Sequence, residues 1–93
     1  MIKSFHDRDT EKIWQGFGTR SFSPPIVKSA YRKMLIINAA EKESDLRNPP
    51  SNYLKKLSGN RAGQYSIRVN DQFRLCFEWK NGEVHNLELV DYH

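Results

Sequence analysis

The stretch QYSIRVNDQFRLCFEW, residues 64–79, alternates apolar and polar side chains twice in succession. The first apolar set is Tyr65, Ile67 and Val69, and the second is Phe73, Leu75, Phe77 and Trp79. A period of two over this length predicts two antiparallel strands, each with one face buried and one face exposed.

The loop between these strands follows from the side chains that each register would bring together. A two-residue turn at residues 70–71 would set Ile67 opposite Arg74, which mixes apolar and charged side chains on one face. A three-residue loop, residues 70–72, instead sets Ile67 opposite Leu75. Because register is set by the hydrophobic pattern, we expect the three-residue loop.

The same register sets Arg68 opposite Arg74 on the other face of the hairpin. Like charges directly opposite in a ladder are destabilising, and a guanidinium stays protonated at ordinary pH. We therefore expect an anion to bind at this pair. The alternative is that both side chains point into solvent or meet Glu78 and Glu88.

Length and composition predict a single domain, residues 1–93, with one modest core. Cys76 is the only cysteine, which excludes a disulfide framework, and no Cys/His spacing suggests a metal site or another cofactor. The N-terminus lacks the apolar core of a signal peptide, and no segment approaches the roughly 20 apolar residues that span a membrane. We expect a soluble, cytoplasmic protein without a membrane partner.

Positive charge is concentrated in one part of the chain, although the net charge of the whole is only +4. Residues 47–77 contain a single acidic residue, Asp71, and include the aromatic residues Tyr53 and Tyr65. Their cations are Arg47, Lys55, Lys56, Arg61, Arg68 and Arg74. Basic residues interleaved with aromatic ones are typical of a surface that contacts nucleic-acid phosphates.

The N-terminal part predicts a short edge strand at residues 2–5 and then two helices. The first helix begins at Asp7 or Asp9, and the second runs from Ser23 to about Glu43. The inward residues expected are Ile13, Trp14 and Phe17 in the first helix and Val27, Ala30, Tyr31, Met34 and Ile37 in the second.

Residues 46–63 read as an irregular loop, because Pro49-Pro50 prevents a helix there. Asn81-Gly82 predicts a hairpin turn, so residues 83–92 return as a further strand. The expected fold is α+β, in the order β-α-α-β-β-β, with two helices packed on a twisted, mainly antiparallel sheet.

The segment LSGNRAGQYSIRVNDQFRLCFEW, residues 57–79, with NPP at 48–50 and DYH at 91–93, resembles the HigB branch of the RelE/ParE toxin superfamily. The resemblance covers the whole chain. It implies a RelE-like fold and a type II toxin that binds the ribosome and cleaves mRNA in the decoding site. It also implies a helix-turn-helix antitoxin of the HigA type, through which alone the toxin would reach operator DNA.

The resemblance also assigns roles to four residues. Arg74 matches the family's phosphate-binding arginine. Asp91, Tyr92 and His93 match its C-terminal active-site residues.

The chemistry of RNA cleavage fits these residue types. Attack by a 2′-hydroxyl without a metal needs a base, cations around the phosphorane and an acid for the departing 5′-oxygen. Arg74 can supply charge-assisted contacts to phosphate. The pKa of His93, ordinarily near 6.5, suits a proton donor, and we expect Asp91 and the adjacent α-carboxylate to raise it. Tyr92 could stack on a base.

Further cations are candidates for contacts to the RNA backbone, namely Lys55, Lys56, Arg61 and Arg68. The loop departs from the resembled pattern, in which relatives can carry a histidine and a lysine before the glycine that Gly59 matches. This chain has Lys55 and Ser58 at those positions, which leaves the general base open.

Strand parity places Leu87, Leu89 and Asp91 on one face of the last strand. If the leucines are in the core, Asp91 and His93 would also point inward unless the strand breaks. We therefore expect a bulge or bend near Val90–Asp91.

Two other functions stay open from the sequence. The first is a ParE-like inhibitor of DNA gyrase that cleaves nothing, against which the basic hairpin and the terminal histidine argue. The second is a weakened toxin that acts mainly as an antitoxin-binding co-repressor, which Ser58 keeps open.

Overall fold

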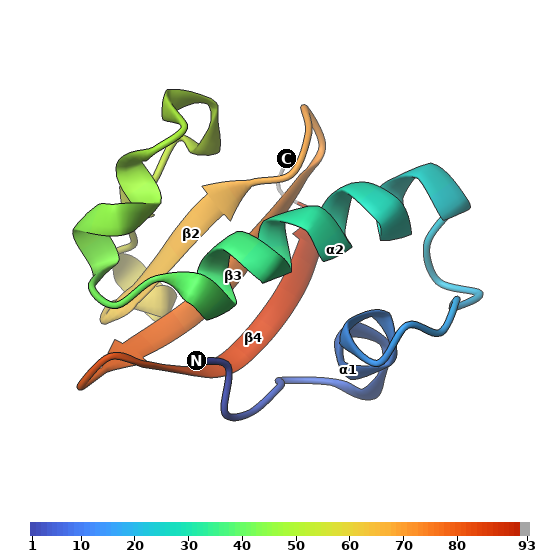
Figure 1. The fold of residues 1–93 in the computed structure, drawn as a ribbon, viewed down its shortest axis with the longest axis horizontal. Helices are drawn as coiled ribbons and strands as arrows, with labels where there is room; N and C mark the ends of the chain where they lie inside the picture. The colour runs from blue at the N-terminus through green and yellow to red at the C-terminus, as the bar shows by residue number, and fades with distance from the viewer. Residues whose placement is uncertain (92–93) are drawn as a thin grey trace.

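The computed structural model describes residues 1–91 and contains two helices packed on an antiparallel sheet (Figure 1). The helices are α1 (Arg8–Trp14) and α2 (Pro24–Ala39), and the strands are β1 (Lys55–Lys56), β2 (Gln64–Arg68), β3 (Phe73–Lys80) and β4 (Glu83–Asp91). Short 3₁₀ turns lie at η1 (Glu43–Arg47), η2 (Pro50–Asn52) and η3 (Gly59–Arg61). The sheet has the order β1-β2-β3-β4, with every neighbouring pair antiparallel, so the α+β prediction is confirmed.

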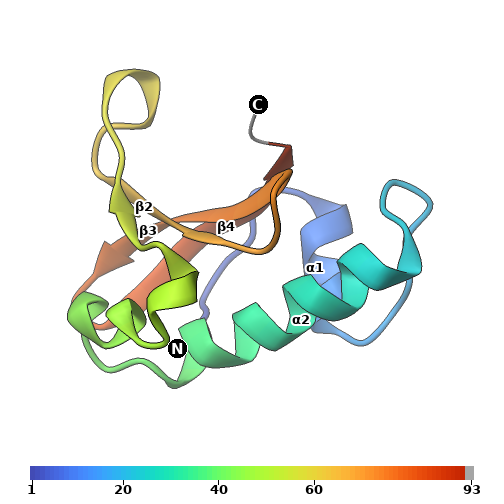
Figure 2. The same ribbon diagram turned by 90° about the horizontal axis from the view of Figure 1, so that it is seen from above.

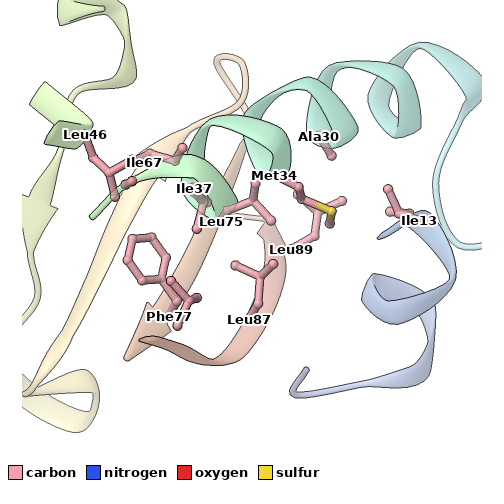
Figure 3. Packing of buried hydrophobic residues seen from close by; sticks show 12 residues of the cluster. Ile13, Ala30, Met34, Ile37, Leu46, Ile67, Leu75, Phe77, Leu87 and Leu89 are labelled. Atoms are coloured by element: carbon pink, nitrogen blue, oxygen red, sulfur yellow. The ribbon is translucent and has the colours of Figure 1, made fainter. Parts of the chain in front are cut away.

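Both helices cover the same face of the sheet, and the segment around η3 projects from the opposite face (Figure 2). The core lies between α2 and the sheet, where Met34 and Ile37 pack against Leu75 and Phe77 (Figure 3). Ile13 brings α1 into the same cluster. Because the core occupies only one face of the sheet, the other face is available for polar side chains.

The β2–β3 hairpin has the register that its pattern predicts. Ile67 pairs with Leu75, and Arg68 pairs with Arg74. The loop is residues 70–72, closed by a hydrogen bond of 2.9 Å from the Val69 amide to the Phe73 carbonyl. The Asn70 side chain accepts hydrogen bonds from two backbone amides of this loop region, which fixes the turn.

The first helix begins where the sequence predicts but buries less than expected. Asp7 caps α1 by accepting a 2.7 Å hydrogen bond from the Thr10 amide. Phe17 was predicted to face inward, yet it is 63% exposed. The helix ends at Trp14, and Gly16, with φ +91°, turns the chain before Phe17 can continue the buried face.

The second helix is shorter than predicted, because it ends at Ala39 instead of about Glu43. The carboxylate of Asp45 accepts hydrogen bonds from the amides of Glu41 and Lys42 at 3.0 and 3.2 Å. These amides are therefore drawn into the following turn and do not extend the helix. Tyr31, predicted to face inward, is 37% exposed.

The N-terminal segment is not a regular edge strand. It meets β4 through two isolated parallel bridges, Ile2 with Val84 and Phe5 with Leu87. Residues 55–56, predicted as part of a loop, instead form β1 and extend the sheet.

The prediction of a bulge or bend near Val90–Asp91 is wrong within the described residues. The β3–β4 ladder stays in register as far as Asp91, which pairs with Phe73. The irregularity lies opposite Cys76 to Glu78, where Asn86 adopts φ +54°. Asp91 needs no break to reach water, because it lies at the strand end and is exposed. His93 and Tyr92, to which the same argument extended, lie outside the described residues.

Within residues 1–91, no helix combines the length and apolar character needed to cross a bilayer.

Candidate functional site: a cationic surface on the sheet

The side of the sheet that faces away from both helices is called the outer face. Strand pairing assigns it the alternate residues of each strand, because the intervening ones point into the core. The outer-face residues of β2, β3 and β4 include Ser66, Arg68, Arg74, Cys76, Glu88 and Val90.

Arg74 is the best-anchored cation of this face and is only 8% exposed. Its Nε donates a 2.8 Å hydrogen bond to Ser66 Oγ. Its Nη2 donates to the Tyr53 carbonyl at 2.5 Å and to the Ser66 carbonyl at 3.3 Å. These contacts come from two separate segments, so the guanidinium is held in one orientation before any ligand arrives.

Arg68 lies beside Arg74 and contacts the same tyrosine from another side. Its guanidinium carbon is 5.5 Å from the centre of the Tyr53 ring, a cation–π distance. It also forms an ion pair with Asp71 in the hairpin loop. The two like charges that the register brings together therefore have separate partners: Arg68 contacts an aromatic ring and a carboxylate, whereas Arg74 contacts a hydroxyl and two carbonyls.

The carboxylates considered as partners for this pair contact other groups. Glu78 accepts a hydrogen bond from Asn86 and lies 3.3 Å from Lys80, and these contacts hold the pKa of Glu78 below its ordinary value. Glu88 contacts Arg61. These contacts pair Glu78 with Asn86 and Lys80, and Glu88 with Arg61, instead of with the two hairpin arginines.

Tyr53 is placed by a buried side-chain amide immediately before it. Asn52 is fully buried, and its Nδ2 donates to the carbonyls of Leu46 and Asn48 at 3.1 and 3.2 Å. Its Oδ1 accepts from Lys33 of α2 at 2.5 Å, and burial lowers the pKa of Lys33. Tyr53 then adopts a left-handed conformation, φ +44°, which aims its carbonyl at Arg74.

The two lysines of β1 lie on opposite sides of the sheet. Lys55 pairs with Ser66 and therefore shares the outer face, whereas Lys56 pairs with Tyr65, which stacks on the core residue Phe77. Both lysines are exposed. The structure thus brings Lys55, and not Lys56, to the side that carries the arginines.

Arg61 reaches the outer face from the turn between β1 and β2. Its Nη1 and Nη2 each lie 3.2 Å from Oε1 of Glu88, and Nη1 also donates to Gln64 Oε1 at 3.1 Å. It is therefore grouped with these two residues on β2 and β4 and does not share the contacts of Arg68 and Arg74.

Asp91 ends β4 next to Val90, which pairs with Arg74. Its Oδ2 accepts a 3.0 Å hydrogen bond from Gln72 Nε2. The described end of β4 therefore lies beside the strand position of Arg74. Tyr92 and His93, the other predicted C-terminal residues of the site, lie outside the described residues.

Sequence reasoning did not find three members of this arrangement: Asn52, the Tyr53 carbonyl as a hydrogen-bond acceptor for Arg74, and Ser66. A backbone carbonyl leaves no side-chain signature, and a single buried Asn or Ser resembles any loop or strand residue. The one available signal was Tyr53 within the basic block. Among residues 1–91, no three His, Cys, Asp or Glu side chains gather in a way that could hold a metal ion.

A family model described as the RelE-like toxin of the type II toxin–antitoxin system HigB matches residues 3–93. The chain belongs to this HigB-like toxin family. It is thus a toxin component of a type II system, with an antitoxin as partner, and the match favours this assignment over a gyrase inhibitor.

Two curated relatives agree with the HigB-like assignment. The chain is 40% identical to Toxin HigB-1 of Vibrio cholerae over 90 residues, which cover 96% of this chain and 95% of that protein. It is 29% identical to Endoribonuclease HigB of Proteus vulgaris over 93 residues, the full length of both.

Solved structures extend the likeness to the fold. The toxin–antitoxin complex YoeB–YefM of Staphylococcus aureus matches with a TM-score of 0.63 at 17% identity, covering 100% of this chain and 98% of the other. The HigB-like chain therefore shares its architecture with YoeB.

Proposed function

We propose that this HigB-like toxin is a metal-independent endoribonuclease that cleaves mRNA in the decoding site of the ribosome. The observation that carries the proposal is the convergence of Arg68 and Arg74 on Tyr53 at the outer face. Two neighbouring guanidinium groups beside an aromatic ring offer both phosphate contacts and a stacking surface. The full-length similarity to a protein named Endoribonuclease HigB supports the same activity.

The proposed reaction is an in-line attack of a 2′-hydroxyl on the adjacent phosphorus. A base accepts the hydroxyl proton, the P–O5′ bond breaks, and an acid protonates the departing 5′-oxygen. The products are a 2′,3′-cyclic phosphate and a 5′-hydroxyl end. Arg74 stabilises the charge of the phosphorane, because a pre-oriented guanidinium needs little reorganisation as that charge develops.

The other roles in the proposal follow from the resemblance and from the end of β4. His93 is the general acid, with Asp91 as its charge partner. Tyr92 stacks on or orients a nucleotide. Asp91 supports this arrangement by its position one residue beyond Val90, the partner of Arg74.

Contacts to the RNA backbone are assigned to Lys55 and Arg68, which share the outer face with Arg74. Lys56, a further candidate from the sequence, is left outside this surface because its strand partner is Tyr65. Arg61, also a candidate from the sequence, directs its donors at Glu88 and Gln64 and is not assigned to the RNA backbone.

The proposed antitoxin is a helix-turn-helix protein of the HigA type that neutralises the toxin and represses their operon. Operator DNA is then contacted by the antitoxin, and the toxin reaches it only through that partner. Support comes from the match to a toxin of the type II HigB system.

The test is incubation of the purified toxin with translating ribosomes and a defined message, followed by mapping of the new 5′ ends. We expect discrete cuts with the unaltered protein and none with His93→Ala. A gyrase supercoiling assay is run beside it. Loss of supercoiling with an intact message would contradict the proposal and favour the ParE-like function.

A further inference from the structure

One ion pair ties together parts of the outer face that are distant in the sheet. Arg61 belongs to η3, between β1 and β2, whereas Glu88 lies on β4, beyond β2 and β3 in the strand order. The Arg61 side chain therefore bridges from the projecting segment, which rises above the sheet in Figure 2, to the far strand.

The contacts of the Arg61 guanidinium restrain its position. Both terminal nitrogens of Arg61 lie 3.2 Å from the same oxygen of Glu88, and Gln64 accepts a further hydrogen bond from Nη1 at 3.1 Å. The side chains are 32% and 20% exposed, so the pair is partly shielded from water. A multiply bonded, half-buried arginine pair is more strongly held than an exposed lysine pair.

A buried thiol lies beneath the same pair. Cys76 is paired with Glu88 across the β3–β4 ladder and has no exposed surface, although it belongs to the outer face. Burial raises the pKa of the Cys76 thiol, Glu88 also raises that pKa, and Arg61 lowers it. Both charged groups thus lie close enough to Cys76 to affect its ionisation.

We propose that Glu88 is a positioning residue, which holds Arg61 and with it residues 57–63 over the outer face. This latch forms one wall of the surface on which Arg68 and Arg74 lie. Arg61 consequently anchors the wall and does not clamp a phosphate, because its donors are directed at Glu88 and Gln64. The role of that wall in RNA cleavage rests on the proposed function, whereas the latch itself rests on the contacts.

The test uses Cys76, the only cysteine of the chain, as a reporter of the wall. The rate of its reaction with N-ethylmaleimide is measured on the whole protein as a function of pH, which separates access from thiol ionisation. Arg61→Gln is expected to raise the access-limited rate about tenfold, because the wall opens more often once the pair is lost. Removing the Arg61 charge would by itself slow the reaction, since that charge favours the thiolate.

The same measurement is made on three further variants. Glu88→Gln is expected to raise access as Arg61→Gln does, and it carries the test if Arg61→Gln does not fold. The double variant Arg61→Glu with Glu88→Arg restores the ion pair and is expected to return the rate to within about threefold of the unaltered protein. Lys3→Gln, which removes an exposed pair with Glu83, is the control and is expected to leave it unchanged.

Measuring message cleavage distinguishes a positioning role of Arg61 from direct binding of an RNA phosphate by Arg61. The single variants are expected to lose cleavage, and the double variant is expected to recover it. If Arg61 instead bound an RNA phosphate directly, a cation would be needed at position 61 and the double variant would stay inactive. Unchanged thiol access in both single variants would overturn the proposal, as would a double variant that stays inactive and accessible. Because thiol labelling needs no ribosome, it tests the latch even if the unaltered protein cuts no RNA.

Discussion

At the scale of single residues, the outer face depends on Tyr53, which contacts both arginines in different ways. Its carbonyl accepts from Arg74, and its ring lies under Arg68. The backbone contact is not made by the ring, whereas the contact with Arg68 is. Substitutions at Tyr53 therefore separate the two arginines experimentally.

We expect Tyr53→Ala to lower message cleavage about tenfold, because Arg68 loses the ring that positions it and a base loses a stacking surface. Tyr53→Phe keeps the ring and should stay close to the unaltered rate. The comparison is made by single-turnover cleavage on ribosomes. Equal losses in the two variants would show that the hydroxyl, and not the ring, is what matters.

Asn52 is the residue whose loss should most affect stability near the site. We expect Asn52→Ala to lower the free energy of unfolding by about 1–3 kcal/mol, because the carbonyls of Leu46 and Asn48 lose a buried donor. Urea unfolding measures this. Asn60→Ala, at an exposed position of η3, is the matched control and should change it by less than about 0.5 kcal/mol.

At the scale of elements, the hairpin and the extent of the last strand were predictable, whereas the position of the irregularity in the last strand was not. The three-residue loop and the Arg68–Arg74 pairing followed from keeping apolar side chains on one face. The irregularity of β4 depends on Asn86, which adopts φ +54°. An asparagine in a strand can also remain extended. The sign of the irregularity is that Val84 and Leu87 are both buried, although strict alternation would place residues three apart on opposite faces.

Asn86 gives a prediction for this element. We expect Asn86→Val to destabilise the fold by about 1–3 kcal/mol, because a β-branched residue is strained at positive φ. Asn86→Gly relieves that strain and loses only the side-chain contact to Glu78. Thermal or urea unfolding of the pair checks this; a valine variant as stable as the glycine variant would contradict it.

At the scale of the whole molecule, the sheet separates a packed face from a charged one. The family, the α+β class and the two helices could be predicted, because they depend on patterns that extend over many residues. The two-residue strand β1 could not, since Lys55 and Lys56 show no alternation. Nor could the contacts of Arg61 with Glu88 and of Arg74 with the Tyr53 carbonyl be predicted, because these partners come from segments distant in sequence.

Because Lys55 and Lys56 lie on opposite faces of the sheet, the same substitution at each position gives a matched comparison. We expect Lys55→Gln to lower kcat/KM for ribosome-bound message about tenfold, because it removes an outer-face cation near the RNA backbone. Lys56→Gln, an identical change on the opposite face, should lower it less than about twofold. The salt dependence of kcat/KM should also weaken only for the Lys55 variant. The reverse order would place the RNA on the other side of β1.

The central claim is that the anchored guanidinium of the outer face acts on the scissile phosphate. It is tested most directly by the single-turnover rate of message cleavage on ribosomes for Arg74→Ala, beside Arg47→Ala at an exposed position of η1. We expect a loss of at least about 100-fold for Arg74→Ala, with Arg47→Ala unchanged and both proteins folded. Cleavage by Arg74→Ala at the unaltered rate, or an equal loss in both variants, would contradict this account.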